Sequence, residues 1–412
     1  MTASSRERPR LRSLQPAVVR HQRQELIHIS DPSGFSDSQI VVTPDVFFIM
    51  ALCDGTRSLV DIQYEYTRRF GTVLLSSHLD KILSDLDRSL FLDNEKFRRR
   101  KGEIEEEFRK AGVRAASHAG QAYPADPEEL RRCLGDFFTS PEGPGALPEK
   151  RRRKTVKAIM APHIDLRAGG TCFAWAYSQL ASSPPADVFV ILGIGHAPMT
   201  NLFTVTSKDF ETPLGILPTD KAFVDALTES YPGDLFADEF AHRSEHSVEF
   251  QTVFLRYIFP DKDISIVPIL CSSFDEMIGA NRQPIEDPRV RDFVQALKIA
   301  AQRSKRKVCF IAGVDLAHIG QKFGDSGRLT PSKEILLERE DMEMLQHVEN
   351  VDAAAFFASV ATDKNKRRIC GFPAMYVLLN LVEGAKGRLL KYGKSVDGAT
   401  QSIVSFASMV FE

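Results

Sequence analysis

Residues 112–412 alternate short apolar runs with longer segments of helical periodicity, and this alternation most constrains the fold. Each run is apolar at nearly consecutive positions, which is typical of strands covered on both faces. Such runs separated by helical segments predict an α/β fold with a mostly parallel or mixed central sheet and flanking helices. The expected strands are Val156–Ala161, Val188–Gly193, Ile264–Leu270, Val308–Gly313, Leu389–Lys391 and Ile403–Phe411. The expected helices are Gly170–Leu180, Asp220–Ser230, His246–Ile258, Asp287–Ser304, Leu336–Val348 and Phe372–Val382.

Polar side chains follow three of these runs at the point where each run ends. His163 comes after the first run, His196 after the second, and Asp315 and His318 after the fourth. Ligands of open α/β sheets bind outside the carboxyl ends of the strands, so parallel strands would bring these side chains to one edge. A single His after a strand is more often a loop residue or a helix cap, and only the recurrence of the pattern predicts a site. Asp315 and His318 would share one face of a helical turn, or else be an N-cap and a first-turn residue.

The helix expected to begin near Ser244 supplies further candidates. Ser244 is the expected N-cap, and Glu245 and Glu249 suit the positive end of the helix dipole. A structural role alone is one interpretation. The functional one is that His246 handles protons and Glu245 lines the pocket, whereas a structural role is favoured for Glu249. Glu211, in a proline-rich loop after the second run, is a further pocket candidate or a solvated loop carboxylate.

Cys370 stands out among the six cysteines. It follows a basic run and directly precedes an apolar helical segment. Nearby cations and a helix N-terminus both favour a thiolate, which can act as a nucleophile or as a soft metal ligand. A buried, inert thiol is the alternative. The cysteines are widely spaced without a CxxC pair, so no disulfide framework is expected and a reducing cytoplasm is the predicted location.

The chain is long enough for two or three domains, and its character changes along its length. Residues 1–24 are polar and basic and are predicted to be a disordered tail. Residues 25–96 carry extended segments, three helical segments and a short strand, which predicts a small winged-helix-like domain. Residues 97–111 are predicted to be a charged, solvated helical linker. Residues 112–412 make up the α/β domain.

The overall composition is that of a globular protein, with 43% hydrophobic residues and a net charge of −2. A near-neutral chain lacks the basic surface that phosphate backbones require, so no nucleic-acid partner is expected. No apolar run approaches about 18 residues, the length needed to span a membrane, so no membrane partner is expected either.

Seven motifs follow one another in the larger domain: Ser117-His118-Ala119-Gly120 with Tyr123–Pro127, Ala161-Pro162-His163, Gly195-His196, Glu211–Gly215, Glu245–Glu249, Asp315–His318 and Ile369-Cys370-Gly371. In this order they resemble the motifs of the Memo-like family, whose bacterial and archaeal members are called AmmeMemoRadiSam system protein B. The resemblance covers about residues 112 to 412. It implies a fold similar to that of class III extradiol dioxygenases, which are non-haem iron enzymes. It also implies a metal triad of His163, His196 and Cys370, with Asp315 and His318 close by.

The smaller domain contains Leu52–Ser58, Ile62 and Arg69-Phe70-Gly71, followed by a leucine-rich helical segment. In these features it resembles the PqqD-like winged-helix modules, which bind precursor peptides for radical-SAM enzymes. It implies a radical-SAM partner protein. A generic winged helix of unrelated use is the alternative.

The leading functional hypothesis is a metal-dependent redox or dioxygenase-like enzyme. Two imidazoles and a thiolate would hold iron or copper and leave positions open for oxygen or for a small-molecule or peptide substrate. Asp315, His318 or His246 would handle protons. One alternative is a non-enzymatic module that binds a peptide or small ligand and acts with a radical-SAM partner. Another uses Cys370 as a nucleophile, with one of the triad histidines as its base.

Overall fold

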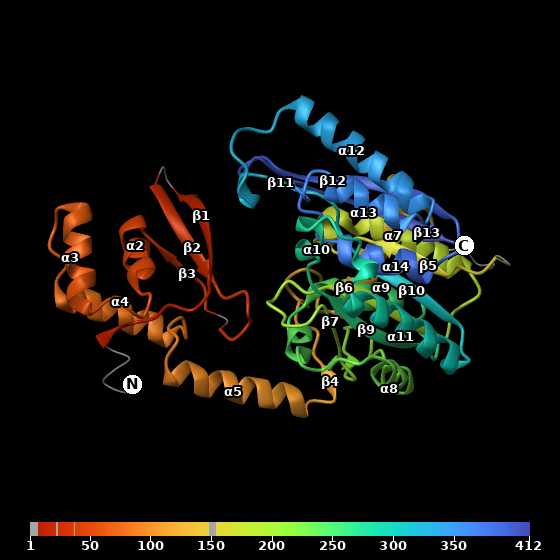
Figure 1. Cartoon of the computed structure of the whole chain (residues 1–412), viewed down its shortest axis with the longest axis horizontal. Helices are drawn as coiled ribbons and strands as arrows, with labels where there is room; N and C mark the ends of the chain where they lie inside the picture. Colours follow the sequence, from red (N-terminus) through yellow and green to blue (C-terminus); the bar gives the residue numbers. More distant parts are fainter. Residues whose placement is uncertain (1–6, 22–23, 37, 148–153) are drawn as a thin grey trace. The chain divides into compact units, whose positions relative to one another are not determined.

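Figure 1 shows the computed structural model of the chain, which describes residues 7–21, 24–36, 38–147 and 154–412. The chain divides into two compact units between Lys110 and Ala111. The first unit has one hydrophobic core of its own, and the second has a large cluster on each face of a central sheet.

The first unit is a three-stranded antiparallel sheet followed by four helices. Strand β1 pairs with β2 over seven residues, and β2 pairs with β3. The prediction of a disordered tail is therefore wrong for Gln15–His21, because these residues pair with β2 along their whole length. Residues 1–6, 22 and 23 of that tail lie outside the described residues. The elements are β1 Gln15–His21, β2 Gln24–Ser30, β3 Ile40–Val42, α2 Pro44–Leu52, α3 Leu59–Phe70, α4 Ser76–Arg88 and α5 Glu95–Lys110.

Local sequence explains where the helices of the first unit begin and end. Ser58 and Asp61 form a reciprocal capping box at the start of α3, and Gly71 ends this helix in the left-handed conformation at φ 70°. Beyond α4, Leu92 makes only an isolated bridge with Leu11, where the sequence predicts a short strand. The winged-helix assignment of this unit stays a prediction.

Helix α5 occupies the segment predicted as a solvated linker. It is helical, but Phe97, Ile104 and Phe108 on its apolar face are buried. Phe97 packs under the guanidinium of Arg12, which lies 3.8 Å from the ring centre. The expectation of a solvated linker is therefore wrong for this face of the helix.

The second unit is built on a mixed sheet, as the sequence predicts, with eight strands in place of the six expected. The order is β11-β13-β5-β10-β6-β9-β7, and β12 also pairs with β13. Strands β5, β10, β6 and β9 are mutually parallel and therefore end at one edge of the sheet, whereas β13 and β7 flank them antiparallel. The strands are β5 Ala158–Ala161, β6 Val188–Ile194, β7 Phe203–Val205, β9 Ser265–Cys271, β10 Val308–Gly313, β11 His318–Gly320, β12 Gly387–Asp397 and β13 Ser402–Phe411. A separate parallel pair consists of β4 Val113–Arg114 and β8 Asp209–Phe210.

Helices cover both faces of this sheet (Figure 1). Side chains alternate along β6, so that Val190 and Leu192 join the cluster on one face and Phe189 and Ile191 that on the other. The first cluster includes α8, α11, α12, α13 and α14, and the second includes α6, α7 and α9. The helices are α6 Pro127–Thr139, α7 Leu166–Ser182, α8 Lys221–Ser230, α9 His246–Ile258, α10 Asp275–Gly279, α11 Pro288–Ser304, α12 Pro331–Glu349, α13 Ala353–Ala361 and α14 Phe372–Leu381, with 3-10 turns at Glu239–Arg243, Pro284–Glu286 and Gln321–Phe323.

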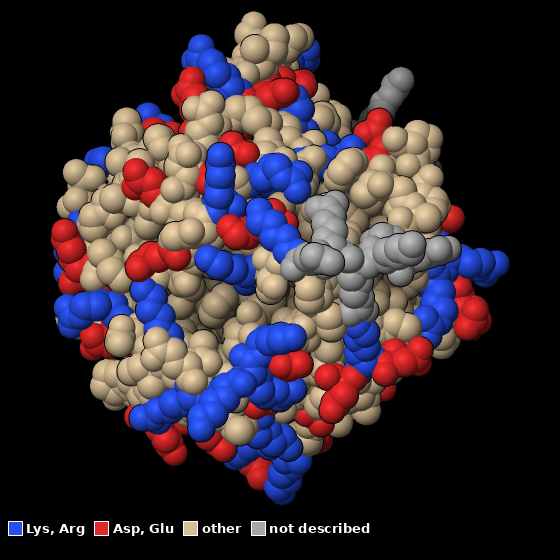
Figure 2. Space-filling view, turned by 90° about the vertical axis from the view of Figure 1, so that its right-hand side faces the viewer, with Lys and Arg blue, Asp and Glu red and all other residues tan. Residues whose placement is uncertain are grey.

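Within the described ranges, no helix is both long and apolar enough to cross a membrane. Figure 2 shows Lys and Arg side chains interspersed with Asp and Glu on one face of the molecule. This mixture agrees with the near-zero net charge of the chain.

Candidate functional site

The candidate site lies where the parallel strands of the second unit end. Strands β5 and β10 are paired at their last residues, and His163 and Asp315 each follow two positions beyond. Strand β6 ends at Ile194, two positions before His196. The sheet therefore delivers three of the predicted side chains to one edge, as expected for the carboxyl ends of parallel strands.

Three imidazoles form the centre of this site. The ring centres of His163 and His196 are 5.1 Å apart, those of His163 and His246 5.3 Å, and those of His196 and His246 4.7 Å. One nitrogen from each ring lies within 4.8 Å of the others, an arrangement compact enough to hold one metal ion. His246 is the first residue of α9 and was expected as a proton-handling group, but the structure also places it at ligand distance.

Backbone contacts hold His163 in one tautomer. Its Nδ1 lies 2.9 Å from the carbonyl oxygen of Gly313, so Nδ1 carries the proton and donates it. Nε2 remains an acceptor, 3.5 Å from Cys370 Sγ and 3.7 Å from a carboxylate oxygen of Asp315. Burial, with a smaller effect of His196, lowers the pKa of His163 to about 3. The ring is therefore neutral at pH 7 and presents Nε2, the form that binds a metal.

Glu245 organises the other two imidazoles. Its carboxylate lies 3.0 Å from His196 Nδ1 and 3.2 Å from His246 Nδ1, and it accepts the N–H of Ser247. Burial alone would lower the pKa of His196, but the hydrogen bond and charge of Glu245 outweigh it and raise that pKa. Burial dominates at His246 and lowers its pKa to about 3. Glu245 is the N-cap of α9, so the expectation that Ser244 caps this helix is wrong.

Asp315 and His318 differ from the prediction in their backbone. His318 begins strand β11, and main-chain hydrogen bonds to Ser405 keep the preceding segment extended. The two residues therefore share no helical turn, and Asp315 is not a helix N-cap. Asp315 instead accepts the N–H groups of His163 and Ile164 with one carboxylate oxygen. Burial raises the pKa of Asp315 to about 6, which places its protonation near neutral pH, and burial lowers the pKa of His318.

Cys370 follows a loop whose backbone is strained at three positions. Lys364, Asn365 and Arg368 have φ values of 57°, 53° and 51°, a conformation that persists in non-glycine residues only where the surroundings fix it. Burial raises the pKa of the Cys370 thiol well above its ordinary value. Arg368, one of the cations expected to favour a thiolate, is paired with Asp325 at 2.6 Å. Burial therefore opposes the thiolate that the nearby cations were expected to favour.

Comparison with known proteins assigns the chain to a family. The family model described as Memo-like protein matches residues 114–410. The chain belongs to the Memo-like family. The matched range includes the three clustered imidazoles and Cys370, so most residues of the candidate site lie within the family model.

Relatives of this Memo-like chain occur in bacteria and archaea. A MEMO1 family protein of Aquifex aeolicus is 31% identical over 386 residues, which is 93% of this chain and 95% of the relative. A second, from Methanopyrus kandleri, is 30% identical over 305 residues, 72% of this chain and 98% of the relative. A third, from Thermus thermophilus, is 27% identical over 357 residues, 86% of this chain and 99% of the relative. Since the second unit is less than three quarters of the chain, the Aquifex match extends into the first unit.

Glu211, predicted as a pocket residue of this Memo-like chain, contacts the segment that leads into the second unit. Its carboxylate accepts the N–H of Ala116 at 3.3 Å, and the residue is exposed. Glu245, the other predicted pocket residue, is buried and contacts two of the clustered imidazoles directly.

A buried ion pair beside the site was missed by the sequence reasoning. The side chains of Arg114 and Glu249 are fully buried and in contact. Glu249 also accepts hydrogen bonds from the Ser117 hydroxyl, the Tyr123 hydroxyl and the backbone N–H of His118. This carboxylate therefore anchors the segment that leads into the second unit onto α9. Its partner Arg114 is 135 positions away, so no local spacing signals the contact.

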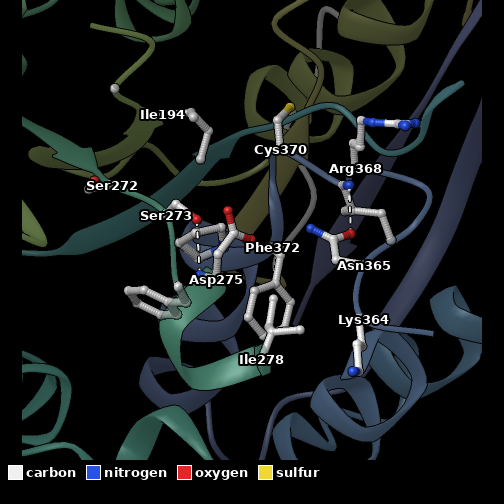
Figure 3. Close-up of a pocket in the computed structure, with 14 residues that line it drawn as sticks. Ile194, Ser272, Ser273, Asp275, Ile278, Lys364, Asn365, Arg368, Cys370 and Phe372 are labelled. Carbon is white, nitrogen blue, oxygen red and sulfur yellow. Dashed lines mark hydrogen bonds between the residues drawn. The ribbon is translucent and has the colours of Figure 1, made fainter. Parts of the chain in front are cut away.

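A pocket of about 420 Å³ opens beside Cys370 in the Memo-like domain (Figure 3). The segment Ser272–Ile278 forms one side and the segment Lys364–Pro373 the other. Ile194 and Gly195, which directly precede His196, complete the wall. The pocket therefore adjoins the imidazole cluster through Cys370 and the end of β6.

Proposed function

We propose that this site holds a redox-active metal ion, iron or copper, and that the protein is a metal-dependent redox or dioxygenase-like enzyme. The observation that carries a metal at this site is the set of three imidazole nitrogens within 4.8 Å of one another, of which those of His163 and His196 belong to the proposed triad. Nδ1 of His163 faces a carbonyl oxygen and Nδ1 of His196 faces a carboxylate, so both rings keep Nε2 for a metal. Imidazole and thiolate donors suit iron and copper.

The proposed ligands are the metal triad, with His246 as a proton-handling neighbour at ligand distance. When bound, the ion would supply one-electron redox chemistry and a binding position for oxygen or substrate. Its positive charge would offset the raised pKa of Cys370 and favour the thiolate. Glu245 orients His196, and Asp315, whose pKa burial raises to about 6, holds or releases a proton beside the cluster.

Metal content tests this proposal and separates the possible ligands. We expect Cys370→Ser to lose bound iron or copper together with any thiolate-to-metal absorption band, and His246→Ala to keep most of its metal. Cys133→Ser, on α6, is the matched control and should change neither. Elemental analysis and visible spectra of the purified variants provide the measurement. If Cys370→Ser keeps metal and spectrum while His246→Ala loses the metal, the three imidazoles are the ligands and the triad is wrong.

The pocket beside Cys370 supports a second candidate function, a non-enzymatic module that captures a peptide or small ligand. Binding without turnover by the metal-loaded protein would favour this alternative. Metal-dependent product formation would exclude it. The raised pKa of Cys370 argues against the third candidate, in which the thiol is a nucleophile without a metal.

We also propose that the first unit recruits a radical-SAM partner, as its resemblance to PqqD-like modules implies. The alignment with the Aquifex relative supports a conserved association of the two units in one chain, since it extends into both. Cross-linking of the full chain in extracts of its own cells should join a radical-SAM protein to lysines of the first unit, such as Lys81. Links restricted to the second unit would contradict this role.

A further inference from the structure

The pocket beside Cys370 has two walls of opposite polar character. On one side, Lys364 brings an ammonium group and Asn365 an amide. The Asn365 Oδ1 accepts the N–H of Ile369 at 2.8 Å, so the amide is fixed and its Nδ2 points toward the pocket (Figure 3). Arg368 lies on the same side but is engaged by Asp325 and by the His318 carbonyl oxygen. The donors available to a ligand on this wall are therefore Lys364 and Asn365.

The facing wall offers acceptors instead. Asp275 lies at the start of α10, where its backbone N–H donates to the Ser273 hydroxyl at 3.0 Å. In Figure 3 its carboxylate lies on the side of the pocket opposite Lys364. Neither Asp275 nor Lys364 forms an ion pair with another residue in the part of the chain that the structure describes. Two opposite charges thus line one pocket without neutralising each other.

Apolar side chains line the pocket between these two polar walls. They come from both sides of the pocket and leave about 420 Å³, within the range of roughly 300–1,000 Å³ that is usual for small-ligand sites. The carboxylate of Asp275 would repel a dianion, and the ammonium group of Lys364 would repel a simple cation. A ligand with one carboxylate, one ammonium group and an apolar side chain satisfies all three features. The apolar lining consists of Ile194, Phe274, Ile278, Ile369, Phe372 and Pro373.

We propose that this pocket binds a small zwitterion of the amino-acid type, with its carboxylate at Lys364 and Asn365 and its ammonium group at Asp275. Cys370 lines the same pocket, so the bound molecule lies next to the proposed metal ligands. The assignment of this molecule as a substrate rests on the proposed function. Its binding does not, because every group that recognises it belongs to the pocket walls.

Three probes with the same aromatic body test the charge requirement: L-phenylalanine, 3-phenylpropanoate and phenethylamine. Binding to the full, chelator-treated chain is measured by saturation-transfer NMR and calorimetry, so that a failure of the metal proposal does not affect the result. We expect L-phenylalanine to bind more tightly than either singly charged probe. Equal or tighter binding of a singly charged probe overturns the proposal, as does the absence of binding by all three at about 10 mM.

Charge-removing variants assign the two ends of the probe. Lys364→Gln should weaken L-phenylalanine and 3-phenylpropanoate by roughly three- to tenfold and leave phenethylamine unchanged, because the exposed ammonium group is partly screened by solvent. Asp275→Asn should weaken L-phenylalanine and phenethylamine and leave 3-phenylpropanoate unchanged. Lys366→Gln and Glu276→Gln are the matched controls, since these exposed neighbours do not line the pocket. If a variant weakens all three probes equally, or not at all, the proposed orientation is wrong.

Discussion

Replacing Arg114 by Met is expected to lower the free energy of unfolding by about 3–5 kcal/mol, because the change leaves the buried Glu249 carboxylate without its counter-charge. Both side chains of this pair are fully buried. Arg114 also donates to the carbonyl oxygens of His242 and Glu245, which would lose their partners. Urea denaturation followed by circular dichroism measures the effect. The loss includes the cost of an uncompensated buried charge and is larger than the net contribution of the pair.

Two further variants identify the cause of that loss. Arg303→Met removes an exposed cation paired with Glu229 at 3.5 Å and should change stability by less than about 0.5 kcal/mol. Adding Glu249→Gln to Arg114→Met should recover part of the stability, because the amide oxygen can still accept from Tyr123 and from the His118 N–H while no buried charge is left without a partner. If Arg114→Met costs less than about 1 kcal/mol, water reaches Glu249 and the pair is not the anchor proposed here.

The pH dependence of this anchor has a definite sign. Burial alone would raise the pKa of Glu249, but Arg114 and the hydrogen-bond donors outweigh it, and the net shift is downward. A carboxylate with a lowered folded-state pKa contributes stability above its unfolded pKa of 4.5, and this stability is lost as the pH falls through the folded value. The contribution should therefore be fully present at pH 7 and disappear in acid.

Much of the second unit follows from local sequence. The residues of β10 and α9 were predicted with the bounds that the structure shows, because a strand covered on both faces leaves a short continuous apolar run and a helix leaves apolar residues at helical spacing. Strand-end placement also predicted that His163, His196 and Asp315 meet at one edge. That inference needs only parallel strands, whose ends coincide whatever the details of packing.

Other features depend on contacts between distant segments and left no local signal. Strand β11 has three residues and exists because β13 pairs with it, so a helical turn at Asp315 was the natural but wrong expectation. Strand β1 was predicted as part of a disordered tail because residues 1–24 are polar and basic. Its Val18 and Val19 are exposed, so the strand depends on backbone pairing with β2, which leaves no apolar signal in the sequence. The pKa of Cys370 depends on burial, which the cations near it in sequence do not reveal.

Replacing His163 by Ala is expected to reduce metal affinity by at least about 100-fold and to leave purified protein without iron or copper. Loss of a ligand should exceed the 10–100-fold effect that is typical when a residue orienting a ligand is removed. Glu245→Gln keeps the shape of the side chain but weakens its hydrogen bond to His196. The loss of metal affinity in this variant should therefore fall within the smaller, 10–100-fold range. His78→Ala, an exposed histidine of the first unit, is the matched control and should bind metal normally. Competition with a chelator of known affinity measures all three.

The pH dependence of metal affinity should distinguish the ligands in the same titrations. His163 and His246, with pKa values near 3, are already neutral above pH 5 and need release no proton. His196 has a raised pKa and must lose a proton to bind in mildly acidic solution, whereas the buried Cys370 thiol must lose one at every accessible pH. As the pH is lowered, the metal affinity should therefore decrease by about one decade per pH unit while the pH is above the pKa of His196, and by about two decades per pH unit below that pKa. Cys370→Ser should remove one decade from both slopes, and an unchanged slope would show that the thiol is not a ligand.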